Sequence, residues 1–225
     1  QEDRRTAMSD ITRFLSGQVQ ALKPSGIRRF FDIVSEMEDA ISLGVGEPDF
    51  VTPWGVRDAA IKSIQRGYTQ YTSNSGLLEL RERIAEYLNR RLGLSYCPKN
   101  QILVTVGASE AIDITFRAVL NPGDEVLVPE PSYVSYAPCI SLCGGVPVPL
   151  RCRREELFKV TPESIEAAVT PRTKVLLLAY PNNPTGAIME REFLEKLVPV
   201  ILKHDLLVVS DEIYSELTYD GSHSS

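Results

Sequence analysis

Three short segments of the chain carry residue types that bind charged ligands. Residues 107–109 (Gly-Ala-Ser) would offer backbone N–H groups and a hydroxyl at the start of a helix, which is an arrangement that binds phosphate. Asn183 lies in a loop between two prolines and could donate a hydrogen bond to a ligand oxygen. Asp211 follows an apolar run, so its carboxylate needs a partner such as a protonated ring nitrogen. Together these groups predict a phosphorylated ligand with a hydroxyl and a basic ring nitrogen.

Each segment also has a simpler interpretation. Ser109 could be the N-cap of a helix after an ordinary glycine turn, and for this segment alone that interpretation is favoured because short glycine loops are weak motifs. Asp211 could likewise cap a following helix. A plain turn does not explain two asparagines between two prolines. All three segments together fit pyridoxal 5′-phosphate, whose protonated ring accepts electrons from a carbanion.

The pattern of apolar runs predicts the elements that position these segments. Strands are expected at residues 41–46, 102–106, 125–128, 146–150, 174–179 and 206–210. Helices are expected at residues 77–92, 109–120, 133–143 and 190–203, with another that starts at Thr161 and Pro162. Continuously apolar strands separated by amphipathic helices predict a three-layer α/β/α sandwich around a mostly parallel sheet. Ligands bind such sheets at the carboxyl ends of the strands, where the three polar segments lie.

Composition excludes several other classes of protein. The net charge is -6 and the arginines are dispersed, which argues against nucleic-acid binding. The four cysteines form no C-x-x-C pair and the chain has only two histidines, so a metal site is not expected. No apolar run approaches the ~20 residues that cross a membrane. We therefore expect a protein of the reducing cytoplasm with no membrane partner.

Seven motifs, in a shared order, carry a resemblance to a known family. They are residues 43–50 (LGVGEPDF), 71–76 (YTSNSG), 104–109 (VTVGAS), 121–126 (NPGDEV), 131–136 (PSYVSY), 181–186 (PNNPTG) and 210–214 (SDEIY). Over nearly all of residues 26–225 the chain resembles the fold-type I, class I/II aminotransferases, which are aspartate/aromatic aminotransferase-like enzymes that depend on pyridoxal 5′-phosphate. The resemblance implies the large domain of that fold, with the C-terminal small domain missing.

The resemblance implies a role for each matching position around the cofactor. Ala108 and Ser109 would hold the phosphate, and Tyr133 would stack on the pyridine ring. Asn183 would bind the hydroxyl oxygen of the ring. The simpler interpretation of Tyr133 is a half-buried packing residue.

Four further assignments complete the implied site. Tyr214 would share the ring hydroxyl oxygen with Asn183, and Asp211 would pair with the ring nitrogen; these three are the catalytic residues that the resemblance implies within the chain. Gly46 and Asn183 would contact the substrate. Tyr71 would reach the phosphate held by a neighbouring subunit, which implies a homodimer, although a loop tyrosine that covers apolar surface is its simpler interpretation.

The resemblance also implies a division of the chain and a missing residue. Residues 1–25 would be an N-terminal arm or lead, residues 26–50 a segment of the small domain, and residues 51–225 the cofactor-binding large domain, incomplete at its C-terminal end. The family binds its cofactor covalently as a Schiff base through a lysine. None of the seven lysines follows an apolar strand after Asp211. We therefore expect a truncated enzyme that is inactive by itself.

The expected reaction is transfer of an amino group between an amino acid and a 2-oxo acid. A C–S lyase or a cyclase on the same fold, and a non-catalytic fragment, remain as alternatives. A nucleotide-binding Rossmann domain is disfavoured because no G-x-G-x-x-G follows the first strand of the alternating region.

Overall fold

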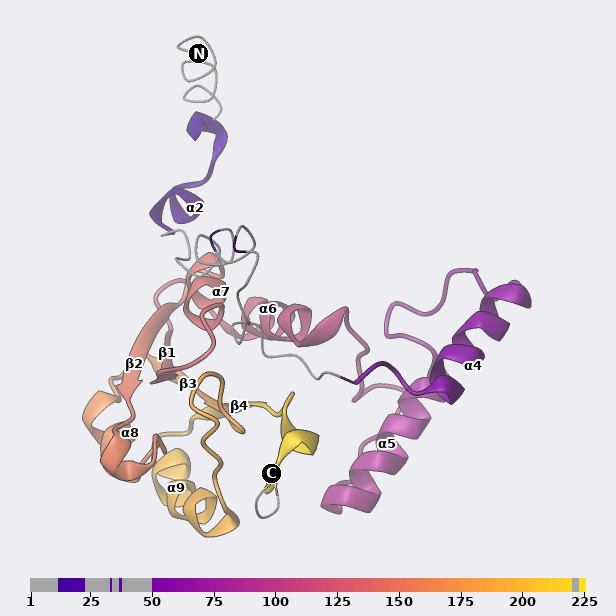
Figure 1. Ribbon diagram of the computed structural model, residues 1–225. Coiled ribbons are helices and arrows are strands. Elements are labelled where there is room, and N and C mark those ends of the chain that lie inside the picture. Colours follow the sequence, from indigo (N-terminus) through magenta and orange to yellow (C-terminus); the bar gives the residue numbers. More distant parts are fainter. Residues whose placement is uncertain (1–11, 23–32, 34–36, 38–49, 220–222) are drawn as a thin grey trace. The chain divides into compact units, whose positions relative to one another are not determined.

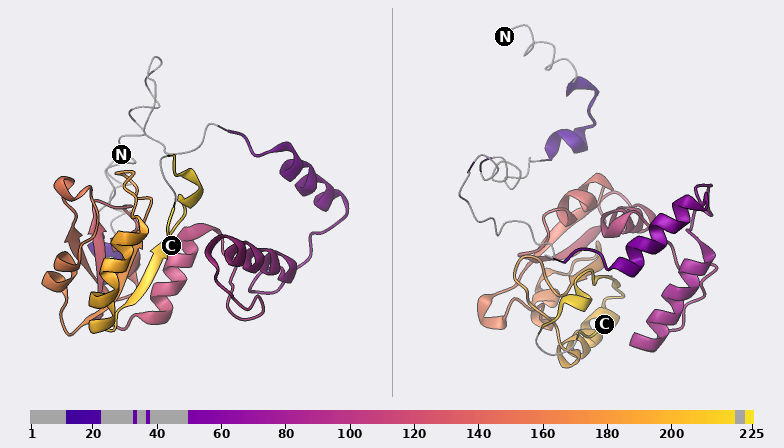
Figure 2. Two further views of the ribbon diagram at one scale, coloured as in Figure 1. Left: turned by 90° about the horizontal axis from the view of Figure 1, so that it is seen from below. Right: turned by 45° about the vertical axis from the view of Figure 1, so that its right-hand side comes forward.

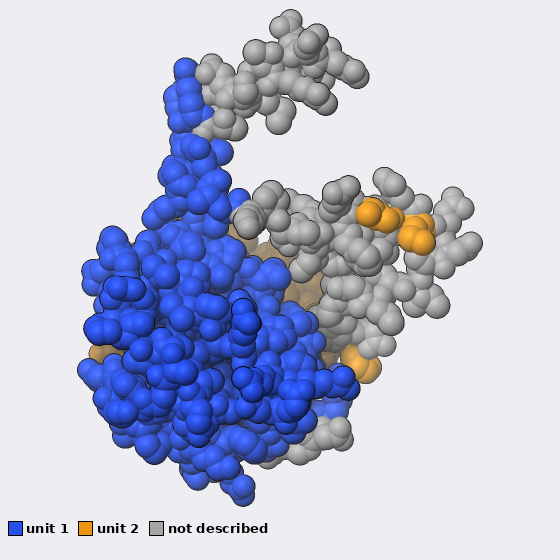
Figure 3. Space-filling model, turned by 90° about the vertical axis from the view of Figure 1, so that its left-hand side faces the viewer, with its two compact units in different colours: residues 1–22, 105–225 blue, residues 23–104 orange. Residues whose placement is uncertain are grey.

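The computed structural model describes residues 12–22, 33, 37, 50–219 and 223–225. The chain divides into two compact units, which Figure 3 colours separately. Residues 1–22 and 105–225 form unit 1, and residues 23–104 form unit 2. The strand expected at residues 41–46, and Gly46 within it, lie outside the described residues.

The described residues of unit 2 include the helices α4 (Trp54–Gln65) and α5 (Leu78–Leu92), both labelled in Figure 1. The expected helix at residues 77–92 is therefore confirmed. Helix α4 was not expected from the sequence, and it has no buried residue. Arg81 of α5 is buried and donates hydrogen bonds to the carbonyl oxygens of Pro98 at 2.6 Å and Lys99 at 3.1 Å. These bonds fix the segment that follows α5 against the helix.

Within its described residues, unit 1 is built on a parallel sheet of four strands. They are β1 (Glu125–Glu130), β2 (Val146–Arg151), β3 (Thr173–Ala179) and β4 (Leu207–Asp211). Their order is β2-β1-β3-β4, and all three pairings are parallel. The expected strand at residues 102–106 is wrong, because these residues have no strand assignment in the described structure. An apolar run becomes a strand only where a neighbouring strand accepts its hydrogen bonds, and local pattern does not supply that neighbour.

Helices cover both faces of this sheet (Figure 1). Four contribute to the layers: α6 (Gly107–Val119), α7 (Tyr136–Leu142), α8 (Pro162–Ala168) and α9 (Arg191–Lys203). Successive residues of β3 alternate between the two cores, since Leu177 packs with buried residues of α6 and α7 and Leu176 packs with those of α8 and α9. Figure 2 shows α6 and α9 on opposite sides of the strands in the left view. The expected α/β/α architecture is confirmed.

Local signals set several helix ends. Thr161 caps α8 by accepting a hydrogen bond from the Ser164 N–H at 3.2 Å, and Pro162 occupies the first helical position, as expected. Gly144 follows α7 with a φ of +83°, as a helix stop requires. Helix α7 begins at Tyr136 and not at Tyr133, so the expected start was three residues early.

The remaining described elements are short helices and connections. They are η1 (Thr12–Phe14), α2 (Gly17–Ala21), η2 (Arg154–Glu156) and η3 (Ser215–Leu217). Among the described helices, none combines the length and the apolar character that crossing a membrane requires. All four cysteines are free thiols.

The connections between the strands open a crevice at the carboxyl ends of β1 and β3. The chain moves from β1 to its neighbour β2 through α7, and then returns past β1 to β3 through α8. Because crossovers between parallel strands are right-handed, a reversal of direction places the connecting helices on opposite faces. The segments that leave β1 and β3 therefore diverge, and ligands bind at such a switch point.

A buried carboxylate stabilises the sheet at the amino ends of its strands, opposite the crevice. Glu125, at the start of β1, is 3% exposed and accepts hydrogen bonds from the Thr170 hydroxyl at 2.6 Å and the Arg172 guanidinium at 2.6 Å. The hydrogen bond from the Thr170 hydroxyl, and a weaker effect of the Arg172 hydrogen bond, hold the pKa of Glu125 below its ordinary value. This network joins the amino ends of β1 and β3.

We expect Glu125→Gln to lower the free energy of unfolding at neutral pH by about 1–3 kcal/mol, because the donors then face a neutral amide. The folded-state pKa of Glu125 is the lower one, so its contribution is present above the ordinary value of 4.5 and is lost as the pH falls through the folded-state pKa. Urea unfolding at pH 7 and in acid measures both effects. Glu155→Gln, at an exposed position, is the control, and equal losses for the two variants would contradict the role of Glu125.

Candidate functional site

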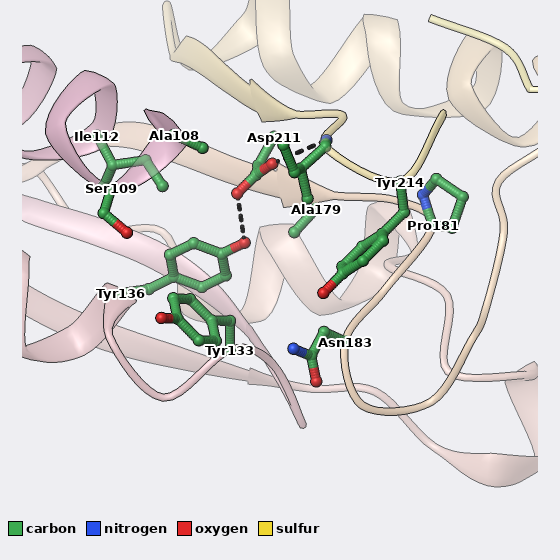
Figure 4. A pocket seen from close by; sticks show the side chains of 11 residues that line it. Ala108, Ser109, Ile112, Tyr133, Tyr136, Ala179, Pro181, Asn183, Asp211 and Tyr214 are labelled. Carbon is green, nitrogen blue, oxygen red and sulfur yellow. Dashed lines mark hydrogen bonds between the residues drawn. The ribbon is translucent and has the colours of Figure 1, made fainter. Parts of the chain in front are cut away.

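A pocket of about 270 Å³ lies at the carboxyl edge of the sheet, within unit 1 (Figure 4). Its volume is near the lower end of the range for small-molecule sites, about 300–1,000 Å³. Four segments contribute to it: the start of α6, the loop after β1, the loop after β3 and the end of β4 with the turn that follows. The lining residues are Ala108, Ser109, Ile112, Tyr133, Tyr136, Ala179, Pro181, Asn183, Asp211, Ile213 and Tyr214.

The start of α6 presents hydrogen-bond donors to the pocket. The N-cap is Val106, whose N–H is bound by the Glu110 carboxylate, and Gly107 has a φ of +78° that favours glycine. Ser109 therefore lies inside the first helical turn, and its simpler interpretation as the N-cap is wrong. Its hydroxyl has no hydrogen-bond partner among the described residues. The first-turn N–H groups also lack partners within a helix, so this end of α6 suits an anion.

The two asparagines of the loop after β3 have different environments. Asn182 is buried, and its side-chain oxygen accepts hydrogen bonds from the Thr185 hydroxyl at 2.8 Å and the Thr185 N–H at 3.3 Å. The Asn182 N–H also donates to the Ala187 carbonyl oxygen at 2.9 Å. Asn183 is exposed, lines the pocket and has no hydrogen-bond partner among the described residues. Asn182 thus fixes the loop, while Asn183 faces the pocket.

Asp211, the last residue of β4, has both carboxylate oxygens engaged. Oδ2 accepts a hydrogen bond from the Tyr136 hydroxyl at 2.8 Å, and Oδ1 accepts one from the Ile213 N–H at 3.1 Å. The carboxylate does not cap a helix, because the next helix begins at Ser215 with Tyr214 as its N-cap. That simpler interpretation is wrong.

The apolar strand before Asp211 is partly exposed. Strand β4 is an edge strand, with Leu207 45% and Val208 38% exposed, and Asp211 itself is half-buried. An edge strand is covered on one side only, so an apolar sequence does not guarantee burial.

Among the described residues, Tyr136 is the one with a polar side chain that lines the pocket and was not expected from the sequence. It is 4% exposed, and burial together with the neighbouring Asp211 carboxylate raises the pKa of Tyr136 above its ordinary value. The phenol therefore remains protonated and serves as a donor. The two rings meet edge to face with centroids 5.6 Å apart, so the spacing of three in the PSYVSY motif could have paired Tyr136 with Tyr133. It could not have shown which of the two is buried.

Six of the eight site residues expected from the sequence line this one pocket: Ala108, Ser109, Tyr133, Asn183, Asp211 and Tyr214. In Figure 4, Ser109 lies on one side, the Asn183 amide and the Tyr214 hydroxyl lie on the other, and the Asp211 carboxylate lies between them. Of the remaining two, Tyr71 is fully exposed in unit 2, and Gly46 lies outside the described residues.

No lysine of the described residues lines the pocket. Two of the described lysines are engaged elsewhere, since Lys159 pairs with Glu190 and Lys174 pairs with Asp124. The described residues around the pocket therefore supply a helix N-terminus, an amide, three phenols and a carboxylate, but no amine.

The fold and the pocket define a class of protein: an open parallel α/β domain with a polar small-molecule pocket at the carboxyl ends of its strands. The family is given by comparison with known proteins, because residues 38–224 match the aminotransferase class I and II family. The chain belongs to this family. The resemblance seen in the sequence is therefore confirmed.

Individual relatives agree with this family. YugH of Bacillus subtilis, a putative aminotransferase by name, is 53% identical over 215 residues, which are 96% of this chain and 56% of that protein. The aspartate/prephenate aminotransferase of Thermus thermophilus is 44% identical over 217 residues, 95% of this chain and 56% of that protein. The chain spans about half the length of the curated relatives it matches.

Solved structures show the same fold. The aspartate aminotransferase from Thermus thermophilus with maleate has a TM-score of 0.88 and 44% identity, and the match covers 94% of this chain and 56% of that one. The Pyrococcus protein-A1 has a TM-score of 0.90 and 42% identity, with coverage of 92% and 54%. The large-domain fold expected from the sequence is confirmed.

The two asparagines of the loop should differ when each is replaced. Asn182→Ala removes an oxygen that holds two donors, so we expect the free energy of unfolding to fall by about 1–3 kcal/mol. Asn183→Ala removes an exposed side chain without a described partner, so we expect a change within about 0.5 kcal/mol. Urea denaturation measures both values, and similar losses for the two variants would refute the division between them.

Proposed function

We propose that this chain forms the cofactor-binding part of a pyridoxal 5′-phosphate-dependent enzyme that transfers an amino group between an amino acid and a 2-oxo acid. The observation that carries the proposal is the meeting of Ser109, Asn183, Asp211 and Tyr214 in one pocket. They come from three separate segments, and their chemistry matches the functional groups of this cofactor. Membership of the aminotransferase family supports the same reaction.

The residues present fit the cofactor group by group. The donors of Ala108 and Ser109 at the positive end of α6 would hold the phosphate, and the hydroxyl of Ser109 has no competing partner among the described residues. The exposed ring of Tyr133 would stack on the pyridine ring. The Asn183 amide and the Tyr214 hydroxyl, which have no described partner either, would bind the ring hydroxyl oxygen.

Asp211 would carry the electrostatic part of catalysis. Its carboxylate would hold a proton on the ring nitrogen, because a negative charge at hydrogen-bond distance favours the protonated ring. When bound, the cofactor supplies an electron sink for negative charge that develops at the substrate α-carbon. Tyr214 and Asn183 would keep the ring oxygen oriented during this change.

The amine that the reaction needs is expected outside this chain. No lysine in the described part of the chain lines the pocket, so we propose that the 225 residues alone hold the cofactor without turnover. The full-length protein, as used below, means this chain joined to the remainder that its relatives have. The lysine and the arginine that binds the substrate carboxylate would belong to that remainder.

Several finer assignments belong to the same proposal. The enzyme would be a cytoplasmic homodimer in which Tyr71 reaches the phosphate held by the neighbouring subunit. Gly46 would lie against the substrate carboxylate through its backbone. Residues 1–25 would be an arm, residues 26–50 part of the small domain, and residues 51–225 the large domain.

Reduction with borohydride in the presence of pyridoxal 5′-phosphate tests the proposed function. We expect the full-length protein to form a stable adduct on one lysine, and peptide mass spectrometry should place that lysine outside residues 1–225. The same protein, given an amino acid and a 2-oxo acid, should release the corresponding products. A full-length protein that forms no defined adduct and exchanges no amino group would refute the proposal.

Asp211→Asn should reduce turnover of the full-length protein by orders of magnitude while the cofactor still binds. The neutral amide cannot balance the charge of a protonated ring, although it keeps the size of the side chain. Steady-state kinetics and the visible absorbance of the bound cofactor measure the two effects separately. The control is Asp205→Asn, at a residue outside the pocket, and wild-type turnover of Asp211→Asn would remove the proposed role.

A further inference from the structure

Tyr136 lines the pocket and makes a hydrogen bond there that the burial of its ring alone does not explain. It is the first residue of α7, is 4% exposed, and donates its hydroxyl hydrogen to Asp211 Oδ2 over 2.8 Å. The bond joins residues 75 positions apart in the sequence. We propose that Tyr136 is a positioning residue, which fixes the Asp211 carboxylate and the Tyr133 ring for a flat cationic heteroaromatic ligand. This inference rests on the proposed function and assigns a further residue to that site.

The first step of the argument is the orientation of the carboxylate. Asp211 Oδ1 accepts the Ile213 N–H at 3.1 Å while Oδ2 accepts the Tyr136 hydroxyl, so a rotation of the carboxylate would break both bonds (Figure 4). A carboxylate offers about four acceptor positions, and these bonds use two of them. The remaining positions are therefore presented to the pocket in a fixed direction. The Ile213 bond alone would fix only one oxygen.

The second step is the contact between the two tyrosine rings. Tyr133 and Tyr136 meet edge to face, with centroids 5.6 Å apart and an interplanar angle of 80°. Tyr133 is 38% exposed and lies in the loop before α7, so part of its ring remains accessible to a ligand. Tyr136 therefore contacts both the carboxylate that would face a ring nitrogen and the tyrosine ring that would stack on the ligand.

The alternative is that Tyr136 is a core tyrosine whose hydroxyl merely needs a partner. Tyr180 shows what such a residue looks like in this protein, because it is 6% exposed and its hydroxyl is bound by backbone groups. It accepts from the Val160 N–H at 3.1 Å and donates to the Phe158 carbonyl oxygen at 3.1 Å. Tyr180 does not line the pocket, whereas Tyr136 does and its partner is the pocket carboxylate. Tyr180 is thus a matched control for the loss of a buried hydroxyl.

The experiment compares Tyr136→Phe with Tyr180→Phe in the full-length protein. Pyridoxal 5′-phosphate labelled with ¹⁵N in its ring is the probe, and the measurements are its dissociation constant, the ¹⁵N chemical shift of the ring nitrogen and the circular dichroism of the bound cofactor. We expect Tyr136→Phe to weaken binding by about tenfold, since a hydrogen bond to a charged group is lost. It should also move the ¹⁵N resonance and reduce the induced circular dichroism. Tyr180→Phe should lower the midpoint of thermal unfolding but leave both spectroscopic signals at their wild-type values.

Two further variants establish that Tyr136 acts through Asp211. In an Asp211→Ala background, Tyr136→Phe should have no additional effect on the dissociation constant, because the partner is already absent. Tyr136→His keeps an aromatic ring and an N–H donor, so it should restore part of the affinity that Tyr136→Phe loses. It also provides the comparison if Tyr136→Phe does not fold, as judged by far-ultraviolet circular dichroism.

The possible failures are distinguishable. A wild-type protein that does not bind the probe rejects the proposed function together with this inference. A wild-type protein that binds it, with an unchanged dissociation constant and ¹⁵N shift in Tyr136→Phe, rejects the inference alone. Equal spectroscopic changes in Tyr136→Phe and Tyr180→Phe also reject it, because the effect would then come from the loss of any buried hydroxyl.

Discussion

Parallel pairing of β3 with β4, in one fixed register, is the constraint on which the pocket depends. Ala179 is the Cα partner of Asp211, so the loop that carries Asn183 begins directly beside the carboxylate. Because side chains alternate between the faces of a strand, a slip of one residue in β4 would turn Asp211 toward the opposite face. β1 pairs on the other side of β3 and contributes the loop that leads to Tyr133 and Tyr136. Residues far apart in the sequence therefore meet because of backbone hydrogen bonds made elsewhere in the sheet.

The sequence predicted those parts of the fold whose cause is local. The apolar runs at β1, β2, β3 and β4, the cap at Thr161 and the stop at Gly144 all depend on residues a few positions apart. The expected strand at residues 102–106 failed because strand formation requires a partner, which no local pattern contains. The partial exposure of β4 has a related cause, since an apolar strand at an edge keeps one side uncovered.

The site could be predicted where its groups lie next to glycine or proline turns, and not where a contact spans the chain. Ser109 and Asn183 stand out because of the turns that hold them, and the structure brings both to the pocket. Tyr136 does not, because its importance arises from a hydrogen bond to Asp211 across 75 positions. Two tyrosines spaced by three give no indication of which ring enters the core. Only the packing of α7 on the sheet decides that Tyr136 is buried and Tyr133 is exposed.

The polar groups of the pocket fall into two sets that would contribute differently to binding. Asp211 already has protein partners on both oxygens, so its orientation is set before a ligand arrives. Ser109, Asn183 and Tyr214 have side chains without described partners, so a ligand would satisfy them without breaking bonds within the described part of the protein. Such a site discriminates strongly against an analogue that lacks a matching oxygen, because the group that faced it is then left unpaired. The unengaged donors would thus give selectivity for a phosphate and a ring oxygen. The carboxylate of Asp211, which the protein already holds in place, would set the direction from which the ligand approaches.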